Sequence, residues 1–323
     1  MRSIRLSYPL NSEQIKVGPV VLAMGFFDGV HRGHQKVIQT AKKYADERHQ
    51  PLAILTYDKL PAIVFKQLAQ PVRYLTPLKT KLALFEKLGV DVTYVMDFTS
   101  DVAELAPQTF VDSVLCKLKP SMVVAGFDHT YGPAEIANMS LLPTYVHDRF
   151  DVQTVGKLAD RTLAEKVSST KIRQLIDEGY VSQANQLLGY EYRTTGIVVH
   201  GFARGRTIGF PTANVQWDVN ERIPAIGVYA VRMWVQGRWF DGMASVGFNV
   251  TFGQNKQMTI EVNLFNFNHH IYGEHVIVQW VQRLRGEVKF ANAEELVNQL
   301  RKDQVVSQQI LADYPFDQDF TVK

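Results

Sequence analysis

The chain contains 323 residues, of which 46% are hydrophobic and 21% are charged, so it is long enough for two domains with separate cores. Its single cysteine excludes an internal disulfide and is typical of a reducing compartment, and a formal net charge of +3 without a long basic run does not favour nucleic-acid binding. The first residues do not resemble a signal peptide and no apolar segment approaches the roughly 20 residues of a membrane span, so we expect a cytoplasmic protein with neither nucleic-acid nor membrane partners.

In the first half of the chain, short apolar segments alternate with helical patterns. Strands are predicted at 17–24, 52–57, 92–96 and 122–126, and helices at 35–48, 79–88 and 107–118. Strands separated by helices predict a parallel sheet with helices on both faces. Ligands of such sheets bind beyond the carboxyl ends of the strands, so the loops after the first, second and fourth of these strands should face one crevice.

The loop after the first strand reads Gly25-Phe26-Phe27-Asp28-Gly29-Val30-His31-Arg32-Gly33-His34. It places His31 and His34 on the first turn of a helix, where unsatisfied N–H groups and the helix dipole attract anions. The pair could also be plain helix surface or two metal ligands, although no further Cys or His lies at a zinc spacing. His-x-Gly-His after Phe-Asp-Gly resembles the nucleotidyltransferase signature, in which both histidines contact the phosphates of a nucleoside triphosphate.

Two further stretches of the first half carry polar groups. Asp128, within the turn at 126–132, is either a turn-forming residue or a ligand of a ribose or base edge. Ser168, Ser169 and Thr170 precede a helix that also carries Lys171 and Arg173. Either Ser168 or Ser169 is no more than the helix N-cap, or the three hydroxyls bind phosphate together with the two cations.

The periodicity changes after 184–192, which is expected to join two domains. Strands are predicted at 195–200, 228–235, 240–246, 257–265 and 276–280, with no helix between them. Many short strands of this kind predict an antiparallel barrel, and 293–311 predicts a C-terminal helix.

The second half has its own candidate site at 200–214, a glycine-rich loop with two arginines that could lie over phosphates. Thr212 and Asn214 offer oxygen ligands of the kind that Mg²⁺ prefers. Glu261, on a predicted strand, is either a solvated side chain or the base for a phosphoryl transfer. The alternative for the loop is a surface hairpin, and the chain has no P-loop motif.

Taken together, these stretches resemble the prokaryotic bifunctional riboflavin kinase/FAD synthetase family. The resemblance rests on the motifs quoted above, on Arg-Gly-Arg-Thr-Ile-Gly-Phe-Pro-Thr-Ala-Asn at 204–214, on Gly-Val-Tyr-Ala at 227–230 and on Leu-Arg-Gly-Glu-Val-Lys-Phe at 284–290. It implies a Rossmann-like nucleotidyltransferase domain over 1–183, which acts as an FMN adenylyltransferase. It also implies a riboflavin kinase β-barrel with a C-terminal helix over 184–323.

The resemblance also implies the roles of individual residues. Glu261 would be the kinase base, His31 and His34 would hold the triphosphate of ATP, and Thr212 and Asn214 would bind Mg²⁺. In the first domain ATP and FMN would be bound by Gly25, Phe26, Phe27, Asp28, Gly33, Asp128, Ser168, Thr170 and Arg173. In the second domain ATP and riboflavin would be bound by Gly201, Arg204, Gly205, Arg206, Gly209, Pro211, Thr212, Asn214 and Arg285. The chain would work as a monomer or weak homo-oligomer.

Two alternatives are open at this point: a kinase with a weak or regulatory first domain, and a flavin or nucleotide sensor that catalyses nothing. A sensor would not need Glu261 or both His31 and His34. The chain also departs from the family pattern at four places. These are Thr-Tyr-Asp-Lys-Leu-Pro at 56–61, Pro-Ala-Glu-Ile-Ala-Asn at 133–138, Asn-Val-Thr-Phe at 249–252 and Phe-Asn-Phe-Asn at 265–268.

Overall fold

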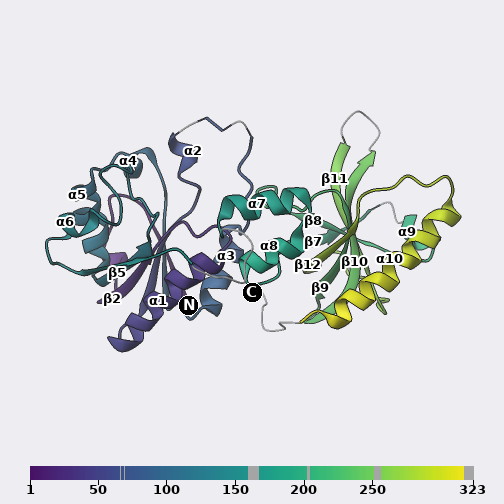
Figure 1. Cartoon of the computed structure of the whole chain (residues 1–323), viewed down its shortest axis with the longest axis horizontal. Helices are drawn as coiled ribbons and strands as arrows, with labels where there is room; N and C mark the ends of the chain where they lie inside the picture. Colours follow the sequence, from purple (N-terminus) through teal and green to yellow (C-terminus); the bar gives the residue numbers. More distant parts are fainter. Residues whose placement is uncertain (66, 69, 159–166, 202–203, 251–255, 316–323) are drawn as a thin grey trace. The chain divides into compact units, whose positions relative to one another are not determined.

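The computed structural model describes residues 1–65, 67–68, 70–158, 167–201, 204–250 and 256–315 (Figure 1). The chain forms two compact units, one running from Met1 to Val167 and the other beginning at Ser168. Each unit is described separately below.

The first unit is built on a six-stranded sheet whose paired strands all run parallel, in the order β1-β4-β3-β2-β5-β6. The strands are β1 (Arg2–Leu6), β2 (Val20–Met24), β3 (Leu52–Tyr57), β4 (Val92–Met96), β5 (Pro120–Gly126) and β6 (Asp151–Val155). This confirms the predicted parallel sheet. The edge strands β1 and β6 were not predicted, because exposed and half-buried positions dominate their sequences.

Helices cover both faces of this sheet. The regular ones are α1 (Arg32–Glu47), α2 (Ala62–Phe65), α3 (Leu78–Lys87), α4 (Ser100–Ala103), α5 (Pro107–Phe110) and α6 (Leu142–Val146). Short helical segments of other kinds are the 3₁₀ helices η1 (Ser12–Gln14) and η3 (Cys116–Leu118) and the π-helix η2 (Val111–Leu115). The helix predicted at 107–118 is confirmed, and it changes from α to π to 3₁₀ hydrogen bonding along its length. Phe110 and Val114 join the core cluster on the face that includes Leu22, whereas the buried residues of α1 lie outside that cluster and cover the other face.

The second unit is a closed barrel of six strands in the order β10-β11-β8-β7-β12-β9. Its strands are β7 (Arg193–Val199), β8 (Ala213–Trp217), β9 (Gly227–Val235), β10 (Arg238–Val250), β11 (Lys256–Leu264) and β12 (His275–Arg285). Its helices are α7 (Ser169–Glu178), α8 (Val181–Leu188), α9 (Arg204–Thr207) and α10 (Ala293–Asp313). The predicted antiparallel barrel and C-terminal helix are confirmed, with β8 as the additional strand.

Two buried polar side chains fasten helices to the barrel. Asn185 of α8 donates to the carbonyl of Trp280 at 2.9 Å and accepts from the N–H of Tyr192 at 2.7 Å. Arg232 of β9 is 5% exposed and donates to the carbonyl of Leu311 at 2.6 Å and to that of Tyr314 at 3.2 Å. The last carbonyls of α10 have no partner within the helix, and this guanidinium satisfies them from the barrel.

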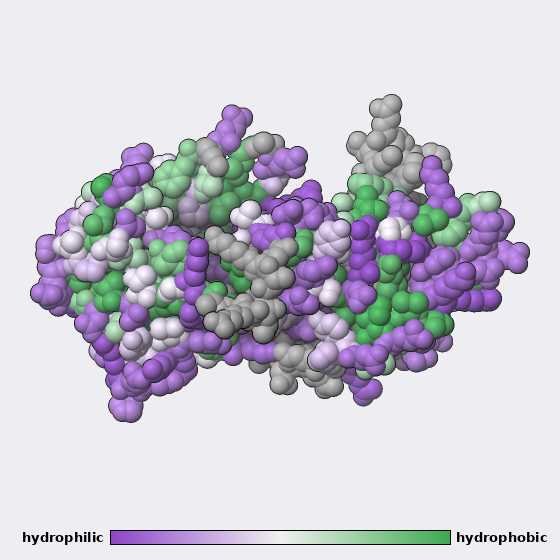
Figure 2. Space-filling model, viewed as in Figure 1, coloured by the Kyte–Doolittle hydropathy of each residue, from purple (hydrophilic) through white to green (hydrophobic). Residues whose placement is uncertain are grey.

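The surface seen in Figure 2 is largely polar, with hydrophobic residues in patches between hydrophilic ones. Within the part of the chain that the structure describes, no helix is both long and apolar enough to span a membrane.

Candidate active sites of the two units

The turn between β2 and α1 has an unusual backbone. Phe27, Gly29 and Val30 have φ angles of 55°, 86° and 36°, in the left-handed region. For a β-branched residue such as Val30 this conformation is strained, at a cost of about 1–3 kcal/mol. Neighbouring groups must therefore hold the turn in place.

The carboxylate of Asp28 is one of these groups. It is 2% exposed, and its Oδ1 accepts the N–H groups of Leu75 at 3.0 Å and Thr76 at 3.1 Å. The Thr76 hydroxyl in turn accepts the N–H of Gly29 at 2.8 Å. These contacts fix the turn to the segment before α3. They give Asp28 a supporting role, and its predicted contact with a substrate stays a prediction.

The two histidines lie together at the start of α1. Nδ1 of His31 accepts the N–H of His34 at 3.2 Å, so the imidazole caps the helix and carries its proton on Nε2 when neutral. The two rings stack with centroids 3.6 Å apart, and the ring of Phe27 packs edge-on against His34. A Cβ at Gly33 would lie only 3.2 Å from the His31 ring, so glycine leaves room for this stack.

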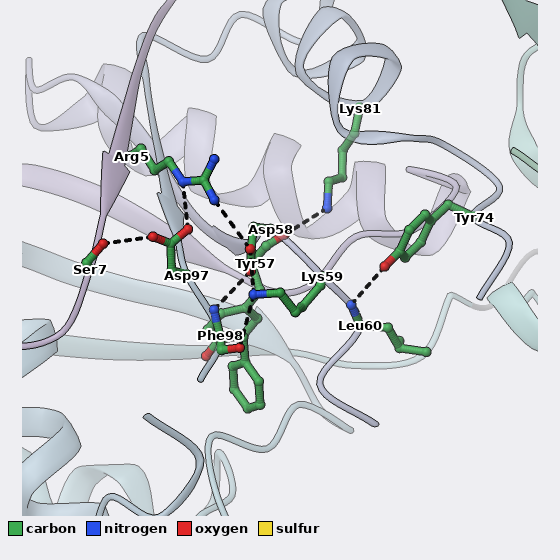
Figure 3. A network of polar contacts seen from close by, with 10 residues as sticks. All are labelled: Arg5, Ser7, Tyr57, Asp58, Lys59, Leu60, Tyr74, Lys81, Asp97 and Phe98. Atoms are coloured by element: carbon green, nitrogen blue, oxygen red, sulfur yellow. Dashed lines mark hydrogen bonds and ion pairs between the residues drawn. The ribbon is translucent and has the colours of Figure 1, made fainter. Parts of the chain in front are cut away.

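Charged residues join the carboxyl ends of β1, β3 and β4 (Figure 3). Arg5 donates to Asp97 at 2.7 Å and lies 3.6 Å from a carboxylate oxygen of Asp58. Asp58 also accepts the N–H of Phe98 at 2.9 Å and pairs with Lys59 at 2.7 Å. The departure from the family pattern at 56–61 thus places both of its charged residues in ion pairs at this edge of the sheet.

The loop after β5 places Asp128 beside the same edge, because β5 is the direct neighbour of β2. Asp128 is exposed, whereas burial lowers the pKa of the adjacent His129 to about 4 and keeps that imidazole neutral near pH 7. The departure at 133–138 closes this loop, with the Asn138 amide donating to the carbonyl of Ala134 at 2.7 Å.

Ser168 begins the second unit and caps α7: its hydroxyl accepts the N–H of Lys171 at 3.2 Å. Thr170 is exposed on the first turn of the same helix and Arg173 is half-buried. The capping interpretation is confirmed for Ser168, and phosphate binding by Ser168, Thr170 and Arg173 stays a prediction.

In the barrel, Glu261 lies opposite Asn214 of β8 and Ser245 of β10 in the strand register. Oε2 of Glu261 accepts the hydroxyl of Thr212 at 3.1 Å. Asn263, two residues further along β11, donates to the carbonyl of Pro211 at 2.7 Å. The structure therefore brings three predicted residues, Thr212, Asn214 and Glu261, to one place.

Two glycines, Gly201 and Gly205, allow the loop before β8 to pack closely against residues 210–214. A Cβ at Gly201 would lie 2.1 Å from the amide nitrogen of Asn214, and one at Gly205 would lie 2.1 Å from the carbonyl oxygen of Phe210. Arg204 and Arg206 lie on the short helix α9 of the same loop, and Arg206 is exposed, as is Gly209. Residues 202–203 of this loop, and residues 251–252 of the departure at 249–252, lie outside the described residues.

Arg285 is engaged within the barrel unit. Its guanidinium donates to the buried carboxylate of Asp303 on α10, at 2.7 Å from Nη2 and 3.1 Å from Nε. This pair fastens α10 to the end of β12, and a contact of Arg285 with ATP or riboflavin stays a prediction. Sequence reasoning missed Asp303 and Asn263, as well as Lys81, whose side chain is buried at the edge of the parallel sheet.

Two family models match the chain in succession: FAD synthetase matches residues 13–171, and riboflavin kinase matches residues 188–311. A bifunctional riboflavin kinase/FMN adenylyltransferase from Listeria monocytogenes is 45% identical over 94% of this chain and 96% of its own length. The chain belongs to the bifunctional riboflavin kinase/FMN adenylyltransferase family.

A second curated relative has the same name, and a solved structure with a different title shares the structure of the whole chain. The protein of the same name from Bacillus subtilis is 40% identical over 94% of this chain and 96% of its own length. A crystal structure described as a macrolide-efflux protein from Streptococcus pneumoniae is 35% identical and superposes with a TM-score of 0.86, covering 97% of this chain and all of that one. The predicted family and the pairing of a kinase with a nucleotidyltransferase are therefore confirmed.

Proposed function

We propose that the barrel unit transfers the γ-phosphoryl group of ATP to riboflavin, and that the parallel-sheet unit transfers the adenylyl group of ATP to the resulting FMN. Membership of a family named for both activities supports the two reactions. The pairing of Glu261 with Thr212 in one unit and the stacked His31 and His34 in the other support the assignment of residues.

For phosphoryl transfer, Glu261 takes the proton from the ribityl hydroxyl of riboflavin as that oxygen attacks the γ-phosphorus. ADP leaves, and the new P–O bond gives FMN. The hydroxyl of Thr212 donates to the Glu261 carboxylate, which orients it for the proton. Most of the catalytic effect comes from positioning the two substrates and from stabilising charge on the phosphates. The family resemblance assigns the binding of ATP and riboflavin to Gly201, Arg204, Gly205, Arg206, Gly209, Pro211 and Arg285.

For adenylyl transfer, a phosphate oxygen of FMN attacks the α-phosphorus of ATP and pyrophosphate leaves. The start of α1 presents backbone N–H groups and the positive end of its dipole, and the Nε2 edges of the histidines can donate to the departing pyrophosphate. The family resemblance assigns Asp128 to the adenosine, and Ser168, Thr170 and Arg173 to further phosphate oxygens. Gly25, Phe26, Phe27, Asp28 and Gly33 shape the turn.

The kinase site also fits a magnesium ion. The Thr212 hydroxyl, the Asn214 carboxamide and the nearby Glu261 carboxylate form a set of oxygen donors. Mg²⁺ is usually held by one or two protein oxygens together with substrate phosphates, and among the described residues no three His, Cys, Asp or Glu side chains gather into a cage. When bound, the ion neutralises charge on the β- and γ-phosphates, and Thr212 and Asn214 would hold it.

We further propose that the functional boundary lies between residues 183 and 184, and that the chain works in the cytoplasm as a monomer or weak homo-oligomer on small-molecule substrates alone. The two family models, which end at residue 171 and begin at residue 188, support the boundary. The single cysteine supports a reducing compartment, and the mild net charge supports small-molecule substrates.

Labelled ATP tests the two transfers separately on the full chain. With riboflavin and γ-labelled ATP, the label should enter FMN. With FMN and α-labelled ATP, it should enter FAD, and a chelator of Mg²⁺ should stop the kinase reaction. Label that stays out of FMN would overturn the kinase assignment, and label that stays out of FAD would overturn the adenylyltransferase assignment.

A further inference from the structure

Lys81 is a buried cation at the edge of the parallel sheet. Its side chain extends from α3 toward the carboxyl ends of β2 and β3 and is 3% exposed (Figure 3). Its ammonium group donates to the carbonyl of Phe26 at 3.0 Å, to the hydroxyl of Thr56 at 3.3 Å and to the carbonyl of Tyr57 at 3.4 Å. It also lies 4.2 Å from the centroid of the Phe26 ring. Moving a charged ammonium group from water into the protein interior costs free energy, so a buried lysine of this kind indicates a structural or functional role.

The hydrogen-bond acceptors of Lys81 lie in the turn between β2 and α1 and at the end of β3. Phe26 directly precedes the left-handed residues of the turn, and Tyr57 is the last residue of β3. Phe85, one helical turn after Lys81 on α3, packs edge-on against Phe27, whose ring contacts His34 in turn. Helix α3 therefore supports the turn at two points, and a continuous chain of contacts connects it to the histidine pair.

We propose that Lys81 is the positioning residue of the adenylyl-transfer site, where its ammonium fixes the strained turn before His31 and adds a positive charge at the edge that receives the polyphosphate of ATP. This inference rests on the proposed adenylyltransferase function. Lys81 acts through the turn, since it donates hydrogen bonds to three protein oxygens.

The charge of Lys81 gives the proposal a pH signature. Burial lowers the pKa of the ammonium to about 8, while the carboxylates of Asp28 and Asp58 oppose this shift. The phenols of Tyr57 and Tyr74 stay neutral in this range, because burial raises their pKa values. Above pH 8 the positive charge is lost, so ATP should bind the first unit more weakly.

The effect of the Lys81 titration on the stability of the fold has the opposite sign to the predicted weakening of ATP binding above pH 8. Between about pH 8 and the ordinary lysine pKa of 10.5, the unfolded chain holds the Lys81 proton more tightly than the folded one. Titration of this group therefore makes the folded state more stable as the pH rises. Weaker ATP binding over that range would therefore not come from destabilisation by the Lys81 titration.

The test compares Lys81→Met, Lys81→Arg and, as the matched control, Lys79→Met, which changes an exposed lysine on the same helix. For FMN adenylylation we expect Lys81→Met to raise the KM for ATP about tenfold or more, since hydrogen bonds from a charged donor are lost. Lys79→Met should match the parent, and all three variants should keep the parent rate of riboflavin phosphorylation. In the parent, the KM for ATP should rise above pH 8, whereas Lys81→Arg should show no such rise up to pH 9.5.

At each pH, the KM for ATP of the parent is divided by that of Lys81→Arg. This ratio removes the contribution of the other charged groups around this edge, which are the same in both proteins: Arg5, Asp28, His31, His34, Asp58, Lys59 and Asp97. A folded Lys81→Met with the parent KM would overturn the proposal. If circular dichroism shows that Lys81→Met has lost its first unit, the parent profile decides, and a KM that stays flat through pH 8 would overturn it. A parent enzyme that makes no FAD from FMN would instead overturn the proposed function, and this inference with it.

Discussion

The role of Glu261 as the kinase base can be tested by removing its charge and little else. Glu261→Gln keeps the size of the side chain, and its amide oxygen can still accept the Thr212 hydroxyl, which lies 3.1 Å from Oε2 in the parent. The strand register with Asn214 and Ser245 depends on backbone groups, so it should persist. The change therefore removes proton transfer while the barrel stays intact.

The expected loss follows from what a general base contributes. Proton transfer by a positioned side chain accelerates a reaction about 10²- to 10⁴-fold, which corresponds to about 3–5 kcal/mol of the activation barrier. Glu261→Gln should lower the kcat of FMN formation by this factor. Glu261→Asp keeps the carboxylate but withdraws it by one methylene, and a displacement of about 1 Å can cost about a hundredfold.

The assay measures FMN formed from riboflavin and ATP, and FAD formed from supplied FMN, in the same preparation. Adenylylation belongs to the other unit, so it should proceed at the parent rate in each variant and serves as an internal control. Glu274→Gln is the matched control in the barrel, because the Glu274 carboxylate accepts an exposed hydrogen bond from the Gln236 amide, remote in sequence from Thr212 and Asn214. If Glu261→Gln forms FMN within about threefold of the parent rate, Glu261 is not the base.

Three further predictions concern other groups. His31→Ala together with His34→Ala should abolish FAD formation from FMN and leave FMN formation unchanged, and a double variant with parental FAD output would refute the phosphate-binding role. Gly205→Ala should raise the kinase KM for ATP, because its Cβ would lie 2.1 Å from the carbonyl oxygen of Phe210, and an unchanged KM would show that the loop yields at little cost. Arg232→Met should lower the free energy of unfolding of the barrel by about 3 kcal/mol in denaturant titrations, because it leaves helix carbonyls unpaired. The exposed Arg238→Met should change that free energy by less than about 0.5 kcal/mol, and equal effects of the two would contradict the capping role.

Much of the fold could be predicted because the buried strands and helix faces are visible in the sequence as apolar patterns. The central strands β2, β3 and β4 are buried at every residue and stand out as apolar runs. The buried positions of α1, such as Val37 and Ala41, recur at helical spacing. In the edge strand β1 only Ile4 and Leu6 are buried, while Arg2 and Arg5 are exposed, so no apolar run marks it and its pattern resembles a loop.

The candidate site was predictable where its residues lie close together in the sequence. His31 and His34 share one helical turn, and Thr212 and Asn214 share one short segment. Lys81 and Asp28 each reach their partners only through the fold. Lys81 lies 55 residues from its acceptor Phe26, and Asp28 lies 47 residues from its donor Leu75. Periodicity places Lys81 on a helix, but not in the interior of the unit.

Arg285 shows a second limit of sequence reasoning, because its motif indicates a ligand contact but does not reveal its protein partner. The structure pairs it with Asp303, 18 residues away on α10. A charged residue in a recognisable motif can thus stabilise the fold, and its sequence neighbours do not reveal its partner.

The central claim, that one chain carries both transfers, is tested most directly by a time course of products. Purified protein is incubated with riboflavin, ATP and Mg²⁺, and the flavins are separated by chromatography with fluorescence detection. The proposed function predicts that FMN rises first and then falls as FAD accumulates. Accumulation of FMN without FAD would contradict adenylyl transfer by the first unit, and riboflavin that remains unconverted would contradict the kinase as well.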